Sequence, residues 1–161
     1  MSQADSFATV WRPHATVACI VTRDARYLMV EETINGRAMF NQPAGHLEDS
    51  ESVFAAAVRE TLEETGWNVE LQHLVGIHQW RSSEHGDMVL RFSFAARALD
   101  HDVQRPLDPD ITRALWLTRS EIAALGERLR SPLILRSIDA WLSGQRLPLS
   151  VIDCLSTGPV A

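Results

Sequence analysis

Four charged side chains recur at close spacing in a helix-forming stretch, VFAAAVRETLEET, which contains neither Gly nor Pro: Arg59, Glu60, Glu63 and Glu64. At about 100° per residue, they fall within an arc of roughly 140° on an ideal helix. Carboxylates at i,i+3 and i,i+4 repel one another by about a few tenths of a kcal/mol per pair. A hard divalent cation such as Mg²⁺ or Mn²⁺ offsets that repulsion, because it prefers carboxylate oxygens. The spacing therefore favours a metal site.

A solvated, glutamate-rich helix surface is the alternative, and for a bare ExxEE pattern it is the commoner case. The neighbouring sequence favours the metal. The loop 41–45, which contains Pro43 and Gly45, lies some fifteen residues before the cluster, so its carbonyl groups could approach the same cations. Glu51 and Arg59 carry opposite charges, and we expect them to pair and hold the helix against this loop.

Local signals predict where the helix begins and ends. Ser52 is a suitable N-cap, and Gly66 suits the left-handed position that follows many helices, so we predict a helix over 53–65. One side of it should pack on the core while the carboxylates face outward. The residues of the side that we expect to be buried are Phe54, Ala57, Val58, Thr61, Leu62 and Thr65.

Several β-rich segments are expected to form the sheet that supports this helix. Asn35-Gly36 marks a turn, and the loop 41–45 is not expected to continue a strand. Residues 82–87 are predicted to join two strands. The predicted strands are 14–21 and 26–32, which form a hairpin, followed by 69–80, 88–98 and 114–117.

Two shorter helices are predicted after the last strand. Thr118 and Glu121 form a capping-box pattern that opens a short helix, and a final helix over 132–143 ends before Gly144. Strands, one long helix, strands and then helices indicate an α+β layered domain rather than strict βαβ winding.

The chain has 161 residues and a mass of 18.0 kDa, which predicts a single domain spanning 1–161. We expect its core over about 13–152 and flexible ends at 1–12 and 153–161. The formal net charge of −6 opposes the broad basic surface that nucleic-acid binding needs. Two cysteines are too few for a disulfide scaffold, and no apolar run reaches the roughly 18 residues of a membrane span. The cytoplasm is the expected compartment.

The glutamate segment resembles the signature box of the Nudix hydrolases. That box has the pattern Gly, five residues, Glu, seven residues, Arg-Glu, an aliphatic residue, any residue, Glu-Glu, any residue, Gly, an aliphatic residue. Thr61 and Trp67 depart from it where aliphatics are usual; we expect Thr61 to keep the packing role and Trp67 to cap the core more bulkily. All seven fixed positions match, as Gly45, Glu51, Arg59, Glu60, Glu63, Glu64 and Gly66.

Further segments resemble the NudJ-type phosphatase branch of that family, over about residues 13–152. The resemblance implies an α/β/α sandwich around a mixed β-sheet. It also implies metal-dependent hydrolysis of nucleoside tri- and diphosphates and of thiamine-type pyrophosphates. The segments are TVAC (16–19), VEETINGRAMFNQPAGHLE (30–48), HQW (78–80), LRF (90–92), RSPL (130–133) and SGQRLPL (143–149).

The resemblance also implies roles for individual residues. Glu60 and Glu64 are expected as the principal ligands of Mg²⁺, for which Mn²⁺ can substitute, with the backbone carbonyl of Ala44 completing the shell. Glu63 is a third ligand or the group that orients water. Arg59 and Glu51 are expected as the orienting pair behind the ligands, with Glu51 also able to bind the metal through water. The catalytic set is therefore Glu60, Glu63 and Arg59, and the identity of a general base stays open.

Residues outside the box give weaker signals. Glu31 or Glu32 could reach a metal or the substrate, although surface charge is the simpler explanation of both. Phe40 and Trp80 could stack on a substrate ring. Arg130 could contact phosphate, with solvation at a helix end as its alternative. Asp108 and Asp110 could add a carboxylate, but turn formation is the simpler explanation of both.

The leading hypothesis is an Mg²⁺-dependent phosphohydrolase that acts on small diphosphate compounds or nucleotides and releases orthophosphate. Cleavage of nucleoside triphosphates to the monophosphate and pyrophosphate is the second. A catalytically silent nucleotide sensor is the third, and the three retained carboxylates argue against it. Neither nucleic acid nor a membrane is expected as a partner; a monomer is the default, and a homodimer stays open.

Overall fold

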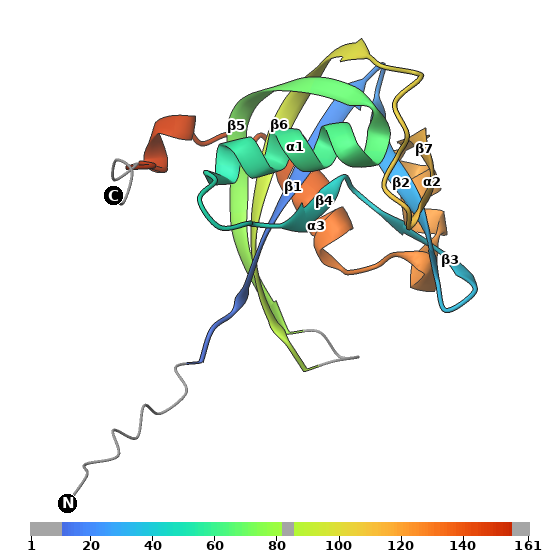
Figure 1. Cartoon of the computed structure of the whole chain (residues 1–161), viewed down its shortest axis with the longest axis horizontal. Helices are drawn as coiled ribbons and strands as arrows, with labels where there is room; N and C mark the ends of the chain where they lie inside the picture. Colours follow the sequence, from blue (N-terminus) through green and yellow to red (C-terminus); the bar gives the residue numbers. More distant parts are fainter. Residues whose placement is uncertain (1–10, 82–85, 156–161) are drawn as a thin grey trace, which may run out of the picture.

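A mixed β-sheet lies at the centre of the fold, with helices on both of its faces (Figure 1). The computed structural model describes residues 11–81 and 86–155. Strands β3, β2, β1, β6 and β5 are hydrogen-bonded in that order, while β4 pairs with β1 and β7 with β2. The strands are β1 (His14–Arg23), β2 (Arg26–Ile34), β3 (Arg37–Asn41), β4 (Ala44–His46), β5 (Trp67–Arg81), β6 (Met88–His101) and β7 (Ile111–Thr118).

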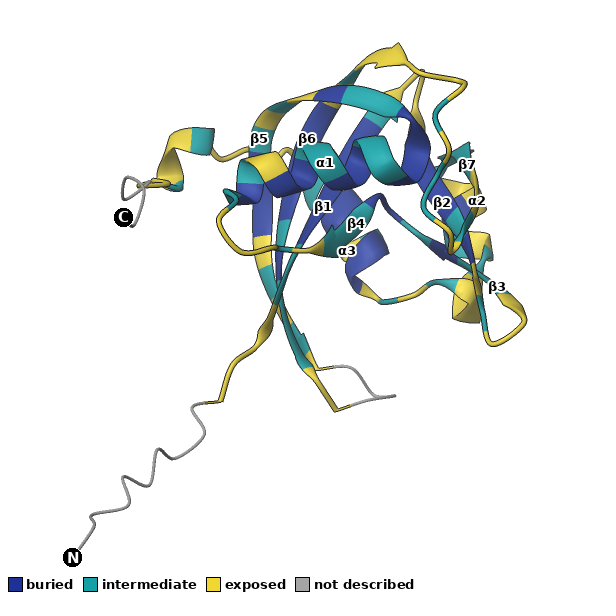
Figure 2. Ribbon diagram, viewed as in Figure 1, coloured by how far each residue is buried: buried dark blue, intermediate teal, exposed yellow. Residues whose placement is uncertain are grey.

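Within the described residues, three α-helices cover the sheet, and two short 3-10 turns follow the second helix and the third. Val17 and Cys19 of β1 pack against helix α1, whereas Ile20 points to the other face and packs against α2 and α3. Figure 2 shows this burial along the strands and at several positions of α1. The expected α+β class with a mixed sheet between helical layers is confirmed. The helical segments are α1 (Val53–Thr65), α2 (Arg119–Ala124), η1 (Gly126–Arg128), α3 (Leu133–Leu142) and η2 (Leu149–Val151).

The predicted caps of α1 are present. The Ser52 hydroxyl accepts a hydrogen bond from the Ala55 amide at 3.1 Å, and Gly66, with φ of 72°, donates from its own amide to Leu62. Thr118 and Glu121 form the expected capping box at α2. These local signals placed the helix starts correctly, because each cap satisfies amide groups that the first helical turn leaves unpaired.

The sheet contains two strands that the sequence did not predict, β3 and β4. The segment 41–45 was expected to form no strand. Only Gln42 and Pro43 lie outside the strands, since β3 ends at Asn41 and β4 starts at Ala44. Proline cannot donate a ladder hydrogen bond, yet its carbonyl can accept one. The Pro43 carbonyl accepts from the Cys19 amide at 3.0 Å, which keeps this segment attached to β1.

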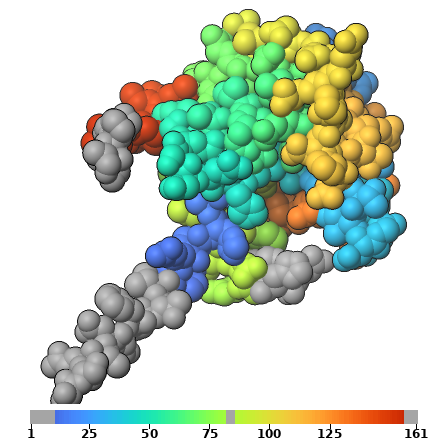
Figure 3. Space-filling view, in the orientation of Figure 1, coloured from blue at the N-terminus to red at the C-terminus, as the bar shows by residue number. Residues whose placement is uncertain are grey.

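The carboxylate side of α1 is covered, contrary to the expectation that it faces outward. Glu60 and Glu64 are 9% and 8% exposed, while Val58 and Leu62, predicted to be buried, are half-buried. The prediction was wrong because β4 and the loop between β6 and β7 pack over this side of the helix. Figure 3 shows that loop beside α1 on one face of the molecule.

The two departures from the Nudix box keep the expected packing roles. Thr61 is fully buried, and its hydroxyl donates to the Ala57 carbonyl within the helix. Trp67 packs against the core and stacks on His101 with ring centres 4.5 Å apart. No helix in the described part of the chain has the length and apolarity that crossing a membrane requires. Most of the predicted flexible ends, 1–12 and 153–161, and most of the 82–87 connection lie outside the described residues.

Candidate active site

Strand β4 and helix α1 together form one wall of the site. The three residues of β4 pair antiparallel with β1, which brings Gly45 directly beneath the helix. A Cβ atom at position 45 would overlap the Glu60 carboxyl group. The backbone of β4 and the Glu60 side chain are thus in close contact, and the glycine of the box permits this approach.

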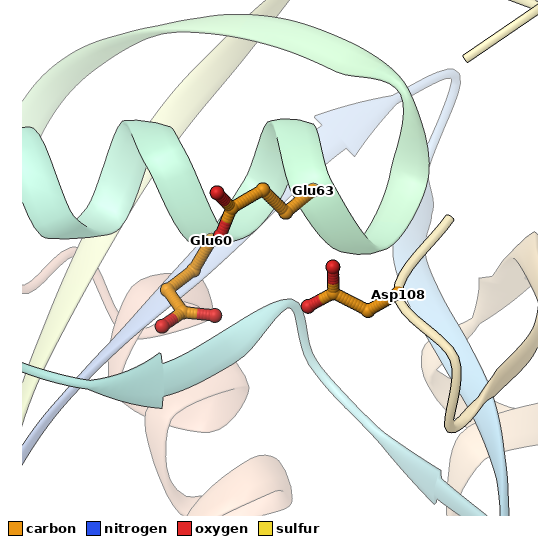
Figure 4. Close-up of side chains that lie close together, drawn as sticks. All are labelled: Glu60, Glu63 and Asp108. Atoms are coloured by element: carbon orange, nitrogen blue, oxygen red, sulfur yellow. The ribbon is translucent and has the colours of Figure 1, made fainter. Parts of the chain in front are cut away.

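Three carboxylates converge at the edge of this wall. One oxygen from each of Glu60, Glu63 and Asp108 lies within 4.8 Å of the others. Figure 4 shows Glu60 and Glu63 extending from α1 and Asp108 extending from the loop between β6 and β7. Oxygen ligands at such spacing suit a hard divalent cation.

Backbone hydrogen bonds hold Asp108 against the helix. Its amide donates to the Glu63 carbonyl at 3.1 Å, and the Asp102 amide donates to the Gly66 carbonyl at 2.9 Å. Asp108 also forms the turn that the sequence suggested, because its carbonyl accepts from the Ile111 amide. Both interpretations of this residue are therefore compatible. Its place directly before β7 was the only sequence signal for its position beside the cluster.

Arg59 connects the box residues. Its guanidinium makes a bidentate pair with Glu51, at 2.7 and 3.0 Å, and also donates to Glu60 at 2.9 Å and to Glu63 at 3.0 Å. A further bond reaches the His46 carbonyl of β4. These bonds hold the pKa of the Glu51 carboxyl below its usual value and raise that of Arg59. The expected pairing of Glu51 with Arg59 is present, and the arginine also offsets much of the repulsion within the cluster.

Glu64 occupies the deepest position of the glutamate set. It accepts a hydrogen bond from the Ala44 amide at 2.8 Å. Burial raises its pKa to about 9, which the Ala44 amide opposes only in part, and burial also raises the pKa of Glu60. A cation bound beside Glu64 would stabilise the ionised form of this carboxyl group, since nearby positive charge lowers a carboxyl pKa.

A cavity of about 410 Å³ opens beside these carboxylates. Glu64 and Asp108 lie at one end of the lining, together with Ala44 and Gly45 of β4. Trp80 and Arg130, both predicted to contact substrate, also line the cavity. Arg130 donates to Glu32 at 2.7 Å, so that its position is fixed by a carboxylate of β2. The cavity thus combines acidic, basic and aromatic groups.

Two residues predicted to contact substrate are not in the cavity lining. Glu31 points away from its neighbour Glu32, and its carboxylate accepts from Arg113 at 2.7 Å. Phe40 is 5% exposed and packs in the core on the α3 side of the sheet, with the Arg128 guanidinium over its ring. In this structure Glu31 pairs with Arg113 and Phe40 packs in the core, so neither side chain lines the cavity.

Sequence reasoning did not single out several polar residues of the lining. Thr16 and Arg91, from β1 and β6, lie next to each other in the sheet, and Asn41 and Ser131 contact the Arg91 guanidinium. Burial lowers the pKa of Arg91 to about 10, so this side chain is charged at neutral pH. An arginine within an apolar strand was the available signal, since a buried charge normally has a partner.

Comparisons with known proteins agree with this geometry. A family model described as the NUDIX domain matches residues 12–138. Phosphatase NudJ of Escherichia coli (strain K12) and that of Shigella flexneri are each 45% identical to the chain over 143 residues, covering 89% of this chain and 92% of each relative. A NUDIX hydrolase structure from Nitrosomonas europaea is 39% identical with a TM-score of 0.87, covering 89% of this chain and 98% of that one. With all seven fixed positions of the signature present and a family model and relatives that match most of its length, the chain belongs to the Nudix hydrolase family.

Proposed function

We propose that this Nudix hydrolase is a divalent-metal-dependent phosphatase of small phosphoric anhydrides. Its proposed substrates are nucleoside tri- and diphosphates and thiamine-type pyrophosphates, from which it releases orthophosphate. The identity of 45% with proteins named as phosphatase NudJ supports orthophosphate as the product. The observation that carries the proposal is the convergence of Glu60, Glu63 and Asp108, the last of which also lines a cavity that contains two arginines.

The donor set fits Mg²⁺, and Mn²⁺ as a substitute. All candidate ligands are hard oxygens, and no cysteine or histidine is among the clustered groups in residues 11–81 and 86–155. Glu60, Glu63 and Asp108 would hold the cation, with Glu64 and the Ala44 carbonyl on the cavity side and Glu51 reaching it through water. When bound, the cation supplies positive charge that neutralises phosphate oxygens and makes water more acidic.

The remaining residues position these groups. Arg59 fixes the carboxylates of Glu60 and Glu63 in orientation, and Glu51 fixes Arg59 through two hydrogen bonds. Glu63, which is half-buried, is the member of the cluster best placed to orient an attacking water. Catalysis in phosphoryl transfer depends mainly on such positioning and on charge stabilisation, so the rigid Arg59 network is a central part of the proposal.

Other residues of the cavity are assigned to binding the parts of the substrate that the cation does not contact. Arg130 offers positive charge to phosphate oxygens, and the Trp80 ring offers a surface on which a nucleobase or a thiamine ring could stack. A shared diphosphate unit with a variable ring is consistent with a substrate range that includes both nucleotides and thiamine-type compounds.

Product analysis tests this proposal directly. Nucleoside triphosphates, nucleoside diphosphates and thiamine pyrophosphate would be incubated with the protein in Mg²⁺, in Mn²⁺ and in EDTA, with orthophosphate and pyrophosphate measured separately. We expect GTP to yield GDP and then GMP with successive orthophosphates, and EDTA to abolish turnover. In ¹⁸O-labelled water, the label should enter the released orthophosphate.

The early time points discriminate between the two modes of cleavage. GMP formed together with uncleaved pyrophosphate, with no GDP, would contradict orthophosphate release and assign the chain to pyrophosphohydrolysis. Full turnover in EDTA would contradict the metal requirement under either mode.

A further inference from the structure

Arg91 is a buried cation in the cavity wall whose hydrogen-bonding capacity is incompletely used. The residue is 5% exposed. Its guanidinium donates to Asn41 Oδ1 at 3.3 Å and to Ser131 Oγ at 3.5 Å, both long for such bonds. The Nε group is buried and has no hydrogen-bond partner among the described residues. The side chain is therefore held in place, but only weakly satisfied.

Thr16 lies beside Arg91 and shows the same feature. The two residues are register partners in the parallel pairing of β1 with β6, and both line the cavity. The Thr16 hydroxyl is buried and, like Arg91 Nε, has no hydrogen-bond partner in the described part of the chain. Two adjacent donors on the cavity floor are thus available to the same ligand.

Carboxylates and two arginines line the cavity, and Arg91 is the arginine that forms no ion pair with any of the described residues. Arg130, the other arginine of the lining, is bound to Glu32, whereas no carboxylate of the described residues lies within salt-bridge distance of Arg91. Leaving a charged donor buried and unpaired is costly, so such groups normally have a partner in the working state. A guanidinium next to a hydroxyl matches the oxygens of a phosphoryl group, to which arginine binds with short, charge-assisted hydrogen bonds.

We propose that Arg91 and Thr16 form a subsite for the second phosphoryl group of the substrate. This is the group joined by the bridging oxygen to the one at the Glu60, Glu63 and Asp108 cluster. The inference rests on the proposed function and extends it, because it explains why a diphosphate unit, rather than a particular ring, is the common element of the substrates. Asn41 and Ser131 act as positioning residues for the Arg91 guanidinium.

Binding of methylenediphosphonate in the presence of Mg²⁺ tests the subsite. This probe has two phosphoryl-like groups, no ring and no hydrolysable bridge. Calorimetric titration should show affinity at least about tenfold weaker in Arg91→Met and about two- to fivefold weaker in Thr16→Val. Arg97→Met is the matched control, since Arg97 lies on the same strand in an exposed pair with Glu70; its affinity should match the wild type.

Melting temperatures without ligand separate a binding role from a structural one. Thr16→Val preserves shape and removes a hydroxyl that makes no bond within the described chain, so the ligand-free melting temperature should be equal to or above that of the wild type. A lower melting temperature of Thr16→Val together with unchanged diphosphonate affinity would overturn the proposal. If Arg91→Met does not fold, Arg91→Lys and Thr16→Val carry the binding test.

Two further results would overturn the subsite. One is diphosphonate affinity in Arg91→Met, or in the folded Arg91→Lys, within twofold of the wild type. The other is a rise in KM confined to substrates of one base while diphosphonate binding is unchanged, which would assign Arg91 to ring recognition. Hydrolysis by the wild-type protein tests the proposed function separately from the subsite. A wild type that binds the diphosphonate through Arg91 but hydrolyses no anhydride would refute the activity and leave the subsite standing.

Discussion

Gly45 and Glu60 occupy adjoining space so closely that a single methyl group at position 45 would overlap the glutamate's carboxyl group. The glycine therefore sets the position of a carboxylate that α1 supplies. Gly45→Ala should displace Glu60 from Glu63 and Asp108, weaken the affinity of the site for Mg²⁺ and lower kcat by at least about tenfold, or about 1.4 kcal/mol. Mg²⁺ titration of activity measures both effects.

A double-mutant cycle identifies whether Gly45→Ala acts through Glu60. If it does, the alanine should cost little further activity in a Glu60→Ala background, because the group that it displaces is already absent. Additive losses in the two variants would show instead that position 45 acts on the site independently of Glu60.

Glu64→Gln preserves size and removes the charge of the most buried carboxylate. We expect kcat to fall by at least about 100-fold, or about 2.7 kcal/mol. The amide oxygen can still accept from the Ala44 amide, so the melting temperature in EDTA should not fall. Added Mg²⁺ should raise the melting temperature of the wild type more than that of the variant. Near-full activity of the variant in EDTA would refute the metal assignment.

Contacts of the site between residues close together in the sequence could be predicted, whereas contacts between residues far apart in the sequence could not. The limits of α1 followed from Ser52 and Gly66, because caps act within a few residues. The pairing of Arg59 with Glu51 was likewise predictable from charge and spacing. The position of Asp108 depends on its hydrogen bond to Glu63, and Arg91 reaches the cavity through the parallel pairing of β6 with β1. Such contacts depend on sheet topology, which residue spacing does not specify.

The same reasoning explains why the environment of the glutamates was mispredicted. Amphipathic spacing indicates which residues share a face of a helix, but not what packs on that face. Strand β4 covers Glu60 and Glu64, and its pairing with β1, a contact between distant parts of the chain, holds it there. The sequence argument assigned relief of the carboxylate repulsion to a cation alone and omitted Arg59, whose bonds to Glu60 and Glu63 lie within the helix itself.

Stability without metal should fall as the pH rises from about 5 to 9. The Glu64 pKa is raised to about 9 in the folded protein from an ordinary value of 4.5, and burial shifts Glu60 in the same direction. Between these values the folded state binds more protons than the unfolded state, so each rise in pH favours unfolding. Mg²⁺ should bind more tightly at higher pH, because it competes with the Glu64 proton.

Melting curves in EDTA and in saturating Mg²⁺ at pH 6 and pH 9 measure this linkage. The gap between the two curves should widen at pH 9 in the wild type and change less in Glu64→Gln, which has no carboxyl group to titrate. An equal gap at both pH values would contradict the assignment of Glu64 as a group whose proton the metal displaces.

Trp80 and Phe40 were both predicted to stack on a substrate ring. They lie in different places in the structure, so substitutions of the two residues should have different effects. Trp80 lines the cavity, so Trp80→Leu should raise KM for nucleotides by about tenfold, since aromatic stacking on a base contributes about 1–3 kcal/mol. The melting temperature should change little. Phe40 is buried in the core, so Phe40→Leu should lower the melting temperature while KM stays within about twofold. Methylenediphosphonate has no ring, and its affinity should be the same in Trp80→Leu as in the wild type. If Trp80→Leu weakened diphosphonate and nucleotides alike, the indole would be supporting the phosphate end of the cavity and not a ring.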